Sequence, residues 1–326
     1  MLGLYFLGTS SGVPTKERNV SGIALKLPEP KSWVLVDCGE GTQHQILSSP
    51  LSLLSLKAIC ITHVHGDHCY GLPGLLASAG MSGRTAPLKI IAPKEVEQMF
   101  DAIKIASDLY LPYEVEFIET NTANKIELDG VSITPIKLSH RVESHAFCFD
   151  SQLTKSELRH KKLIESGVQS GPLWGEIKRG NNVTLDDGQV IKASEYIDTK
   201  SFKNRVVIAG DNDDLTLLNN VIDSADVLVH ESTYTEALLE KIGPSPQHSS
   251  ALRVAKFSQS VKLPCLILTH FSARFQSKDK NLKNSIEEIR QEAQSAFSGT
   301  LFLANDHDSF SVSDDGVVIH NEEENV

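Results

Sequence analysis

The sequence predicts an α/β fold in which strands and helices alternate along the chain. Short apolar runs rich in β-branched residues recur, as strands do. Helical patterns separate several of these runs, for instance "PKEVEQMFDAIKIAS" and "NSIEEIRQEAQSAF", whereas "VTLDDGQVI" is typical of a hairpin. With 326 residues and 40% hydrophobic content, the chain is long enough for one large globular domain or two smaller ones.

Neither membrane nor disulfide signals are present in the sequence. No apolar run approaches the roughly 18 residues that span a bilayer, and the first residues, "MLGLYFLGTSSG", lack the basic region of a signal peptide. The five cysteines are scattered, odd in number and without a CxxC spacing, which is typical of reduced thiols. We therefore expect a cytoplasmic protein that makes no contact with a membrane.

Six of the predicted strands finish on a residue that can bind a metal. The runs are "WVLVD", "KAICITH", "VSITPIKLSH", "RVVIAGD", "ADVLVH" and "PCLILTH", and they end on Asp37, His63, His140, Asp211, His230 and His270. In open α/β sheets, ligands bind in the crevice at the carboxyl ends of the strands. We therefore expect these side chains to converge on one site.

The stretch "THVHGDH" predicts more than one metal ion. In an extended segment, His63 and His65 point the same way and can present both imidazoles to one ion. Gly66 permits a sharp turn, after which Asp67 and His68 face a second point. Imidazole and carboxylate ligands together fit Zn²⁺ or a similar first-row metal. With the ligands at the other strand ends, the pattern favours two metals. The neighbouring cysteine of "DHCYG" either joins the ligands or only fills space at a helix start.

The charge of the chain is unevenly distributed. The net charge is −11, which by itself argues against a nucleic-acid partner. Residues 151–180 nevertheless contain six basic residues against three acidic ones. Composition alone leaves two interpretations of this segment, a solvated helix face and a contact surface for RNA.

Along the chain, "THVHGDH" is accompanied by the motifs "PTKERN" and "LTHFSARF". The first resembles the signature of the metallo-β-lactamase superfamily. The other two are more specific and resemble, within it, the ribonuclease Z family of tRNA 3′-processing endoribonucleases. "DCGEGTQHQIL", "KLSHRVESHAF", "GPLWGEIKRG", "AGDN", "HEST" and "QHSS" follow the family order, so the resemblance covers residues 6–275. It implies an αββα sandwich of four layers, formed by residues 1–326 as a single catalytic domain, with a protruding arm inserted at 151–180.

The resemblance implies two zinc ions per subunit. Three histidines hold one ion, an aspartate and two histidines hold the other, and a further aspartate bridges them (His63, His65 and His140; Asp67, His68 and His270; Asp211). Asp37 is expected to be buried behind the ligands and to orient them, and His230 is placed there with it.

The implied reaction is hydrolysis of a phosphodiester. Asp67 is expected to accept a proton from the attacking water. His248 of "QHSS" is implied to donate a proton to the leaving 3′ oxygen, with Glu231 of "HEST" as its partner. The family more often has alanine where Ser232 stands and threonine where Ser250 stands, which puts the fine positioning of this pair in question.

Precursor tRNA is the substrate that the resemblance implies. The arm is expected to grip it through basic residues such as Lys161 and Lys162, with Gly171 and Pro172 at its return. A homodimer is implied, in which the arm of one subunit grips the tRNA that the other cleaves.

Three further basic residues are candidates for contacts near the cleavage site. Lys16 and Arg18 of "PTKERN" resemble contacts to the 3′ end of the tRNA. Arg274 follows the ligand His270 in the same loop, where it either contacts phosphate or is solvated.

Two other functions remain open on the sequence. One is a different hydrolase on the same scaffold, acting on a thioester, a lactone or a sulfate ester, which would need neither the basic arm nor the pair of His248 and Glu231. The other is a non-catalytic RNA-binding subunit, which the complete set of expected ligands disfavours.

Overall fold

The computed structural model describes residues 1–275 and 285–321. The chain forms two compact units. The first consists of residues Met1–Ser151 and Asn204–Val326, and the second of Gln152–Lys203. Within the part of the chain that the structure describes, no helix is long and apolar enough to cross a membrane.

Two large sheets form the centre of the first unit. Within the described residues, one sheet has eight strands in the order β19-β18-β1-β3-β4-β5-β6-β7. The strands from β4 to β7 are parallel, and those from β19 to β4 are antiparallel. In chain order their bounds are β1 Leu2–Gly8, β3 Gly22–Lys26, β4 Trp33–Val36, β5 Leu56–Cys60, β6 Leu88–Ala92, β7 Val115–Glu119, β18 Ser309–Val312 and β19 Val318–Asn321.

The other sheet, counted over the same ranges, has seven strands in the order β17-β15-β14-β13-β10-β9-β8. The strands from β13 to β17 are parallel, whereas β8, β9 and β10 pair antiparallel. In chain order their bounds are β8 Ile126–Leu128, β9 Val131–Leu138, β10 Ser144–Leu158, β13 Ile197–Ala209, β14 Val227–Glu231, β15 Cys265–Thr269 and β17 Thr300–Leu303. A short parallel pair, β2 (Ser10–Ser11) and β16 (Phe271–Ser272), links the loops that follow β1 and β15.

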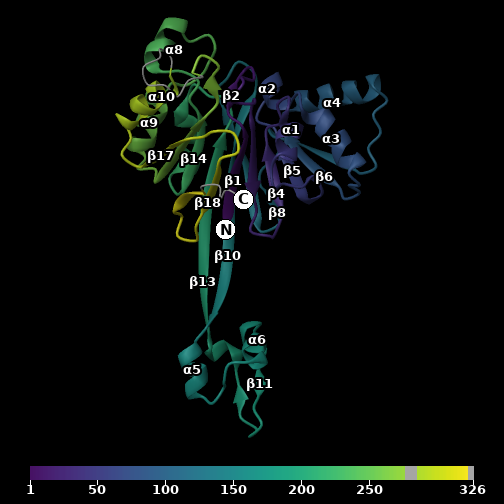
Figure 1. Cartoon of the computed structure of the whole chain (residues 1–326), viewed down its shortest axis with the longest axis vertical. Helices are drawn as coiled ribbons and strands as arrows, with labels where there is room; N and C mark the ends of the chain where they lie inside the picture. The colour runs from purple at the N-terminus through teal and green to yellow at the C-terminus, as the bar shows by residue number, and fades with distance from the viewer. Residues whose placement is uncertain (276–284, 322–326) are drawn as a thin grey trace. The chain divides into compact units, whose positions relative to one another are not determined.

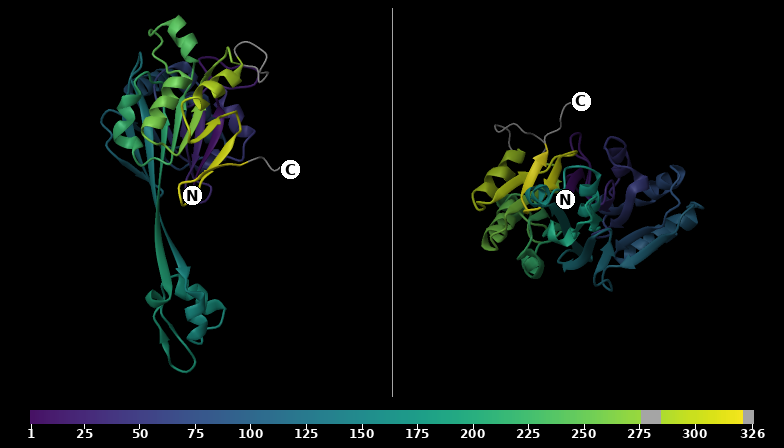
Figure 2. Two further views of the ribbon diagram at one scale, coloured as in Figure 1. Left: turned by 90° about the vertical axis from the view of Figure 1, so that its left-hand side faces the viewer. Right: turned by 90° about the horizontal axis from the view of Figure 1, so that it is seen from below.

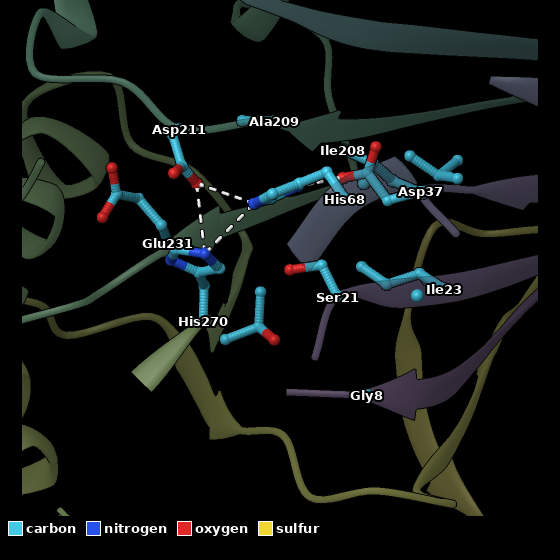
Figure 3. Close-up of a pocket in the computed structure, with 13 residues that line it drawn as sticks. Gly8, Ser21, Ile23, Asp37, His68, Ile208, Ala209, Asp211, Glu231 and His270 are labelled. Carbon is cyan, nitrogen blue, oxygen red and sulfur yellow. Dashed lines mark hydrogen bonds and ion pairs between the residues drawn. The ribbon is translucent and has the colours of Figure 1, made fainter. Parts of the chain in front are cut away.

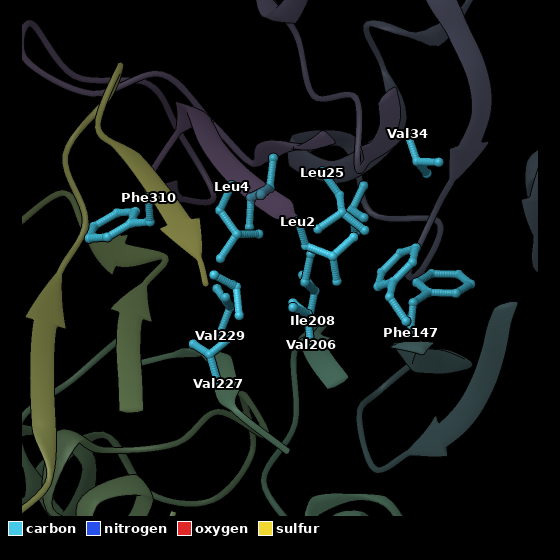
Figure 4. Packing of buried hydrophobic residues seen from close by; sticks show 14 of the residues in the cluster. Leu2, Leu4, Leu25, Val34, Phe147, Val206, Ile208, Val227, Val229 and Phe310 are labelled. Carbon is cyan, nitrogen blue, oxygen red and sulfur yellow. The ribbon is translucent and has the colours of Figure 1, made fainter. Parts of the chain in front are cut away.

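Three apolar layers hold the first unit together. The layer between the sheets buries side chains of both, among them Leu4 and Leu25 from one and Phe147 and Val229 from the other (Figure 4). A second layer packs α1 (Thr42–Leu47), α3 (Leu72–Met81) and α4 (Lys94–Ala106) on the outer face of the eight-stranded sheet. A third packs α7 (Asn219–Ile222), α9 (Ala251–Ser260) and α10 (Ile286–Gln294) on the outer face of the other. The αββα sandwich that the sequence predicts is confirmed (Figures 1 and 2).

The second unit has a small core of its own. It contains α5 (His160–Glu165), α6 (Pro172–Lys178) and the hairpin of β11 (Val183–Thr184) with β12 (Val190–Ile191). Leu163, Val168 and Ile177 are buried together with residues of the hairpin and Tyr196. The hairpin is the one that "VTLDDGQVI" predicts. The compact unit extends to Lys203, past the 151–180 segment that the sequence indicates as the insertion.

Candidate active site

The expected ligands meet at the carboxyl ends of the strands, as the sequence predicts. His63 and His65 follow β5, and Asp67 and His68 lie in the short helix α2 (Gly66–Cys69). The other three ligands follow β9, β13 and β15 (His140, Asp211 and His270). The ends of these strands lie at the same edge of the sandwich, so each end carries the next polar residue to that edge. Segments more than two hundred residues apart in the sequence thus contribute to one site.

One cluster of donor atoms contains three imidazole nitrogens and a carboxylate oxygen. Nδ1 of His65 lies 3.1 Å from Nε2 of His63 and 3.2 Å from Nε2 of His140. Oδ2 of Asp211 lies 3.6 Å from the first of these Nε2 atoms and 3.7 Å from the second. Four donor atoms therefore surround one point.

A second cluster shares the same aspartate. Nε2 of His68 and Nε2 of His270 are 3.2 Å apart, and Oδ2 of Asp67 lies 3.4 and 3.3 Å from them. Oδ1 of Asp211 is 3.6 Å from the nitrogen of His68 and 3.4 Å from that of His270 (Figure 3). The two oxygens of Asp211 therefore face two different clusters, which is the arrangement of a bridging ligand.

The spacing of these atoms, and the protonation of three of the histidines, fit metal ions. Two nitrogens bound to one ion at about 2.0–2.1 Å and a tetrahedral angle are about 3.3–3.4 Å apart, close to the spacing observed. Burial lowers the pKa of His63, His65 and His140, which favours the neutral imidazole that binds a metal. Burial also lowers the pKa of His68, but the charges of Asp67 and other carboxylates outweigh it and raise this pKa. The donor set therefore supports a metal cofactor.

A buried aspartate and its threonine neighbour orient two of the histidines. Asp37 receives hydrogen bonds from the backbone N–H and the hydroxyl of Thr62, at 2.8 and 3.0 Å, and its Oδ2 lies 2.7 Å from Nδ1 of His68. The hydroxyl oxygen of Thr62 is also 3.0 Å from Nδ1 of His63. With each Nδ1 donating a proton, each Nε2 keeps a lone pair for a metal. The structure places Asp37 behind the ligands.

Two further histidines are held in the same way by groups that the sequence analysis missed. Nδ1 of His140 donates to the backbone oxygen of Gln247 at 2.8 Å. Nδ1 of His270 donates to the hydroxyl of Thr233 at 3.0 Å, and this hydroxyl in turn donates to Oε2 of Glu231. A carbonyl leaves no side-chain signal, but Thr233 belongs to the "HEST" motif.

The backbone is strained at this edge of the sheets. Asp37, Gln247 and His270 have φ angles of 62°, 54° and 57°, in the left-handed region that disfavours residues with a Cβ. His270 belongs to a donor cluster, and Asp37 and Gln247 each orient a histidine that belongs to one. Strain of this kind gathers at functional sites, where the surrounding structure holds it.

A buried carboxylate and a histidine form a pair beside the clusters. Nδ1 of His248 lies 3.1 Å from both oxygens of Glu231, and Glu231 also accepts from the backbone N–H of Asn212 at 2.9 Å. Burial lowers the pKa of His248, but the charges of Glu231 and Asp211 raise it to about 9. Burial raises the pKa of Glu231, and the nearby histidines, His248 first, lower it below the ordinary value. The pair is therefore a carboxylate with a cationic imidazole, whose second nitrogen is free to donate a proton.

The remaining residues of this region have structural partners. Nε2 of His230 is 3.4 Å from the side-chain amide nitrogen of Asn212, and its Nδ1 donates to the backbone oxygen of Glu231, so it supports the segment after Asp211. Ser250 caps α9 by accepting from the N–H of Arg253 at 3.2 Å. Cys69 donates to the oxygens of Val64 and His65 at 3.2 Å and lies outside the clusters.

The predicted RNA contacts differ in accessibility. Lys16, Arg274 and Lys161 are exposed. Lys162 donates to the oxygen of Glu195 at 3.0 Å and lies 4.7 Å over the ring of Tyr196. Gly171 and Pro172 are exposed as well, and Pro172 is the first residue of α6.

Arg18 has a structural role. It is 7% exposed, and its guanidinium donates to the hydroxyl of Thr9, the oxygen of Ala304 and the side chain of Asn305, at 2.6, 2.7 and 3.0 Å. Burial lowers its pKa. These bonds join the loop after β1 to the loop before β18. Because the guanidinium is buried and donates to protein groups, Arg18 does not present it on the surface as the predicted RNA contact requires.

The hydroxyl of Thr233 provides a test of how the histidines are held. Replacing Thr233 by valine keeps the shape of the side chain but leaves Nδ1 of His270 without its acceptor. We expect metal affinity to fall by about 10- to 100-fold, the usual effect of removing such a partner. Titration against a chromophoric chelator measures it. Thr233→Ser keeps the hydroxyl and should retain the affinity, whereas equal affinity in the valine variant would contradict the role.

Known proteins resemble the chain over nearly its whole length. Residues 32–156 match a family model described as a β-lactamase superfamily domain. Proteins named ribonuclease Z from Marinobacter nauticus and Brevibacillus brevis are 44% and 37% identical to the chain, over 95% and 94% of its length and 96% of each relative. The solved structure of human tRNase Z, short form, has a TM-score of 0.64 at 22% identity, covering 95% of this chain and 99% of that one, and shows a shared fold.

Proposed function

Because the chain belongs to the ribonuclease Z family, we propose that it removes the 3′ trailer from precursor tRNA. It is an endoribonuclease and a metal-dependent hydrolase. The observation that carries the proposal is that Asp211 joins two donor clusters directly beside the pair of His248 and Glu231. Hydrolysis of a phosphodiester needs a nucleophile, stabilisation of charge on the phosphate and a proton for the leaving oxygen. The two clusters would supply the first two through bound metal, and the pair would supply the proton.

The proposed cofactor is two zinc ions per subunit. His63, His65 and His140 would hold one ion. Asp67, His68 and His270 would hold the other, and Asp211 would bind both ions. When bound, the ions supply a nucleophile at neutral pH and offset the negative charge of the phosphate. Asp67 completes the second cluster, and the backbone N–H of Gly12 donates to its Oδ2 at 2.7 Å. This bond fixes the carboxylate in place.

His248 is the proposed general acid. Its Nδ1 is occupied by Glu231, so Nε2 is the nitrogen that donates a proton to the departing 3′ oxygen. The side chain is 11% exposed, enough for a substrate atom to reach it. Proton transfer to this oxygen leaves a 3′-hydroxyl on the mature tRNA and a 5′-phosphate on the trailer.

Mapping the product ends of a defined precursor tRNA tests the function. We expect a 3′-hydroxyl on the tRNA, a 5′-phosphate on the trailer, and loss of cleavage when a chelator removes the metal. A protein that hydrolyses a thioester or a lactone but leaves the RNA intact would contradict the proposal.

The second unit is the proposed handle for tRNA. Among the described residues, Lys161 and Lys178 are exposed and have no ion pair, whereas Arg159 and Arg179 pair with Asp198 and Glu176. The unpaired lysines are available to the RNA backbone. Such a handle also explains how a chain of net charge −11 binds RNA.

Removal of the second unit should separate binding from chemistry. Ser151 and Asn204 flank the unit on the neighbouring strands β10 and β13, so a two-residue Asn-Gly turn can replace Gln152–Lys203. We expect a higher KM for precursor tRNA and retained hydrolysis of bis(p-nitrophenyl) phosphate. Steady-state kinetics on both substrates check this. Equal losses on the two would contradict a handle separate from the site.

We further propose that the protein is a cytoplasmic homodimer in which the second unit of one subunit grips the tRNA that the other cleaves. The family resemblance supports this proposal. Mixing a subunit that lacks Gln152–Lys203 with one that lacks His248 tests it, because only a dimer of this kind regains cleavage of precursor tRNA.

A further inference from the structure

The loop that carries His248 begins and ends at one place in the fold. It follows α8 (Glu236–Ile242) and returns to α9, which starts at Ala251. The N–H of Ala251 donates to the backbone oxygen of Tyr234, just before α8, at 3.0 Å, so the N-termini of the two helices lie side by side. On its other side α9 packs against α10 (Figure 1). Because His248 lies three residues before Ala251, its position depends on where α9 starts.

One carboxylate from α10 caps both helices. Oε1 of Glu292 accepts from the N–H of Glu236 and from the N–H of Leu252, each at 2.9 Å, and Oε2 lies 3.0 Å from the first of these nitrogens. Glu236 is the first residue of α8, and Leu252 is the second residue of α9. The first N–H groups of a helix have no partner within the helix, and the helix dipole also favours a carboxylate there. A single side chain thus fixes the starts of two helices relative to each other.

The other side chains at these helix ends do not replace this carboxylate. Thr235, at the N-cap of α8, makes no side-chain capping bond, so the cap comes from Glu292. On α9, Ser250 donates to the side chain of Glu236, and Arg253 pairs with the same carboxylate at 2.8 Å. The side chain of Arg253 is 49% exposed, and exposed ion pairs contribute little to stability. Glu292 is therefore the main link between the two N-termini.

The loop is also attached to the candidate active site. The backbone oxygen of Gln247 accepts from Nδ1 of His140 at 2.8 Å, and the hydroxyl of Ser249 donates to the backbone oxygen of Asn212 at 2.6 Å. His248 lies between these two attachments. Glu292 belongs to neither donor cluster, so it acts on the site through the loop.

We infer that Glu292 is a positioning residue for the general acid. By capping α8 and α9 together, it holds the start of α9, and with it the backbone of His248, where Nε2 reaches the leaving 3′ oxygen. Glu231 orients the imidazole through Nδ1, whereas Glu292 places the segment from which that side chain extends. The inference rests on the proposed function of His248.

The leaving group provides the test of this role. The 3′ oxygen of precursor tRNA needs a proton to depart, whereas p-nitrophenolate leaves without one. We expect Glu292→Ala to lower the single-turnover rate on precursor tRNA, at saturating enzyme, by about 10- to 100-fold, the cost of a small misplacement of a catalytic group. Hydrolysis of bis(p-nitrophenyl) phosphate and the metal content, both measured with zinc in excess, should match those of the unaltered chain.

Matched variants separate the reach of this side chain from its charge. Glu292→Gln keeps the oxygen that both N–H groups share and should retain most of the rate on precursor tRNA. Glu292→Asp keeps the charge but is one CH₂ group shorter, so it should lose the bond to one helix and slow cleavage. This pair keeps the inference testable where Glu292→Ala does not fold, and an aspartate variant as fast as the glutamine variant would overturn it. Glu288→Ala removes an exposed carboxylate one turn earlier on α10 and should leave both activities unchanged.

A double-mutant cycle connects Glu292 with His248. In the His248→Ala background, Glu292→Ala should cause no further loss, because the group that it positions is absent. Losses that multiply, equal losses on the two substrates, or loss of metal from Glu292→Ala would each overturn the inference. If the unaltered chain does not cleave precursor tRNA at all, the proposed function fails. If it cleaves and Glu292→Ala is equally fast, only the role of Glu292 fails.

Discussion

Replacing Asp67 by alanine is expected to lower the turnover of precursor tRNA by at least about 10²-fold while the fold persists. Oδ2 of Asp67 lies 3.3 Å from Nε2 of His270 and 3.4 Å from Nε2 of His68, so its loss removes a donor from the second cluster. Burial raises the pKa of Asp67, but the charges of and hydrogen bonds from His68 and His270 lower it far below the ordinary value. The group is therefore a carboxylate at neutral pH, the form that binds a cation.

Single-turnover cleavage and metal analysis check this expectation together. Asp67→Asn keeps the shape of the side chain and loses its charge, so it should also lose activity and weaken the second metal. Asp101→Ala removes an exposed carboxylate on α4 and serves as the control. Near-normal cleavage by the alanine variant would reject the role of Asp67.

Replacing His248 by alanine is expected to slow cleavage by about 10²- to 10⁴-fold, the usual contribution of a general acid. The variant should still bind both metals, because Nδ1 of His248 is engaged by Glu231 and lies 3.6 Å from the nearest oxygen of Asp211. A precursor with a 3′-bridging sulfur at the cleaved bond should restore much of the rate, because a thiolate leaves without a proton.

Two comparisons sharpen the experiment on His248. His44→Ala changes an exposed histidine on α1 and should cleave normally. Glu231→Gln should slow cleavage, and its combination with His248→Ala should be no slower than the latter alone, since the two act as a unit. Loss of metal from His248→Ala would show that the residue is a ligand instead.

The strand ends were predictable from sequence because a buried strand must be apolar until it leaves the core. "KAICITH" becomes β5 and ends at Cys60, three residues before His63, and "PCLILTH" becomes β15 and ends one residue before His270. Ligands at such ends are visible as polar residues after an apolar run. The metal clusters followed from this pattern together with the family resemblance.

The groups that orient the ligands were not predictable, because many of them are backbone atoms. The carbonyl of Gln247 and the N–H of Gly12 leave no trace in residue type. Arg18 shows the opposite case, since a basic residue in a surface-like motif is buried by contacts from a segment 286 residues away in the sequence. The insertion extends to Lys203, which the sequence did not indicate, because the first half of its closing strand, β13, is mostly exposed and has a polar sequence.

The left-handed backbone at Asp37, Gln247 and His270 has a consequence for the evolution of this protein. Each such residue costs the folded state about 1–2 kcal/mol, which glycine at the same position would not incur. Selection for heat resistance alone would therefore favour glycine at Gln247, which contacts His140 through its backbone oxygen, but would have no such freedom at the other two. Among these three positions, a substitution by glycine that raises the thermal stability and keeps the activity is therefore expected at Gln247, where the site uses only the backbone.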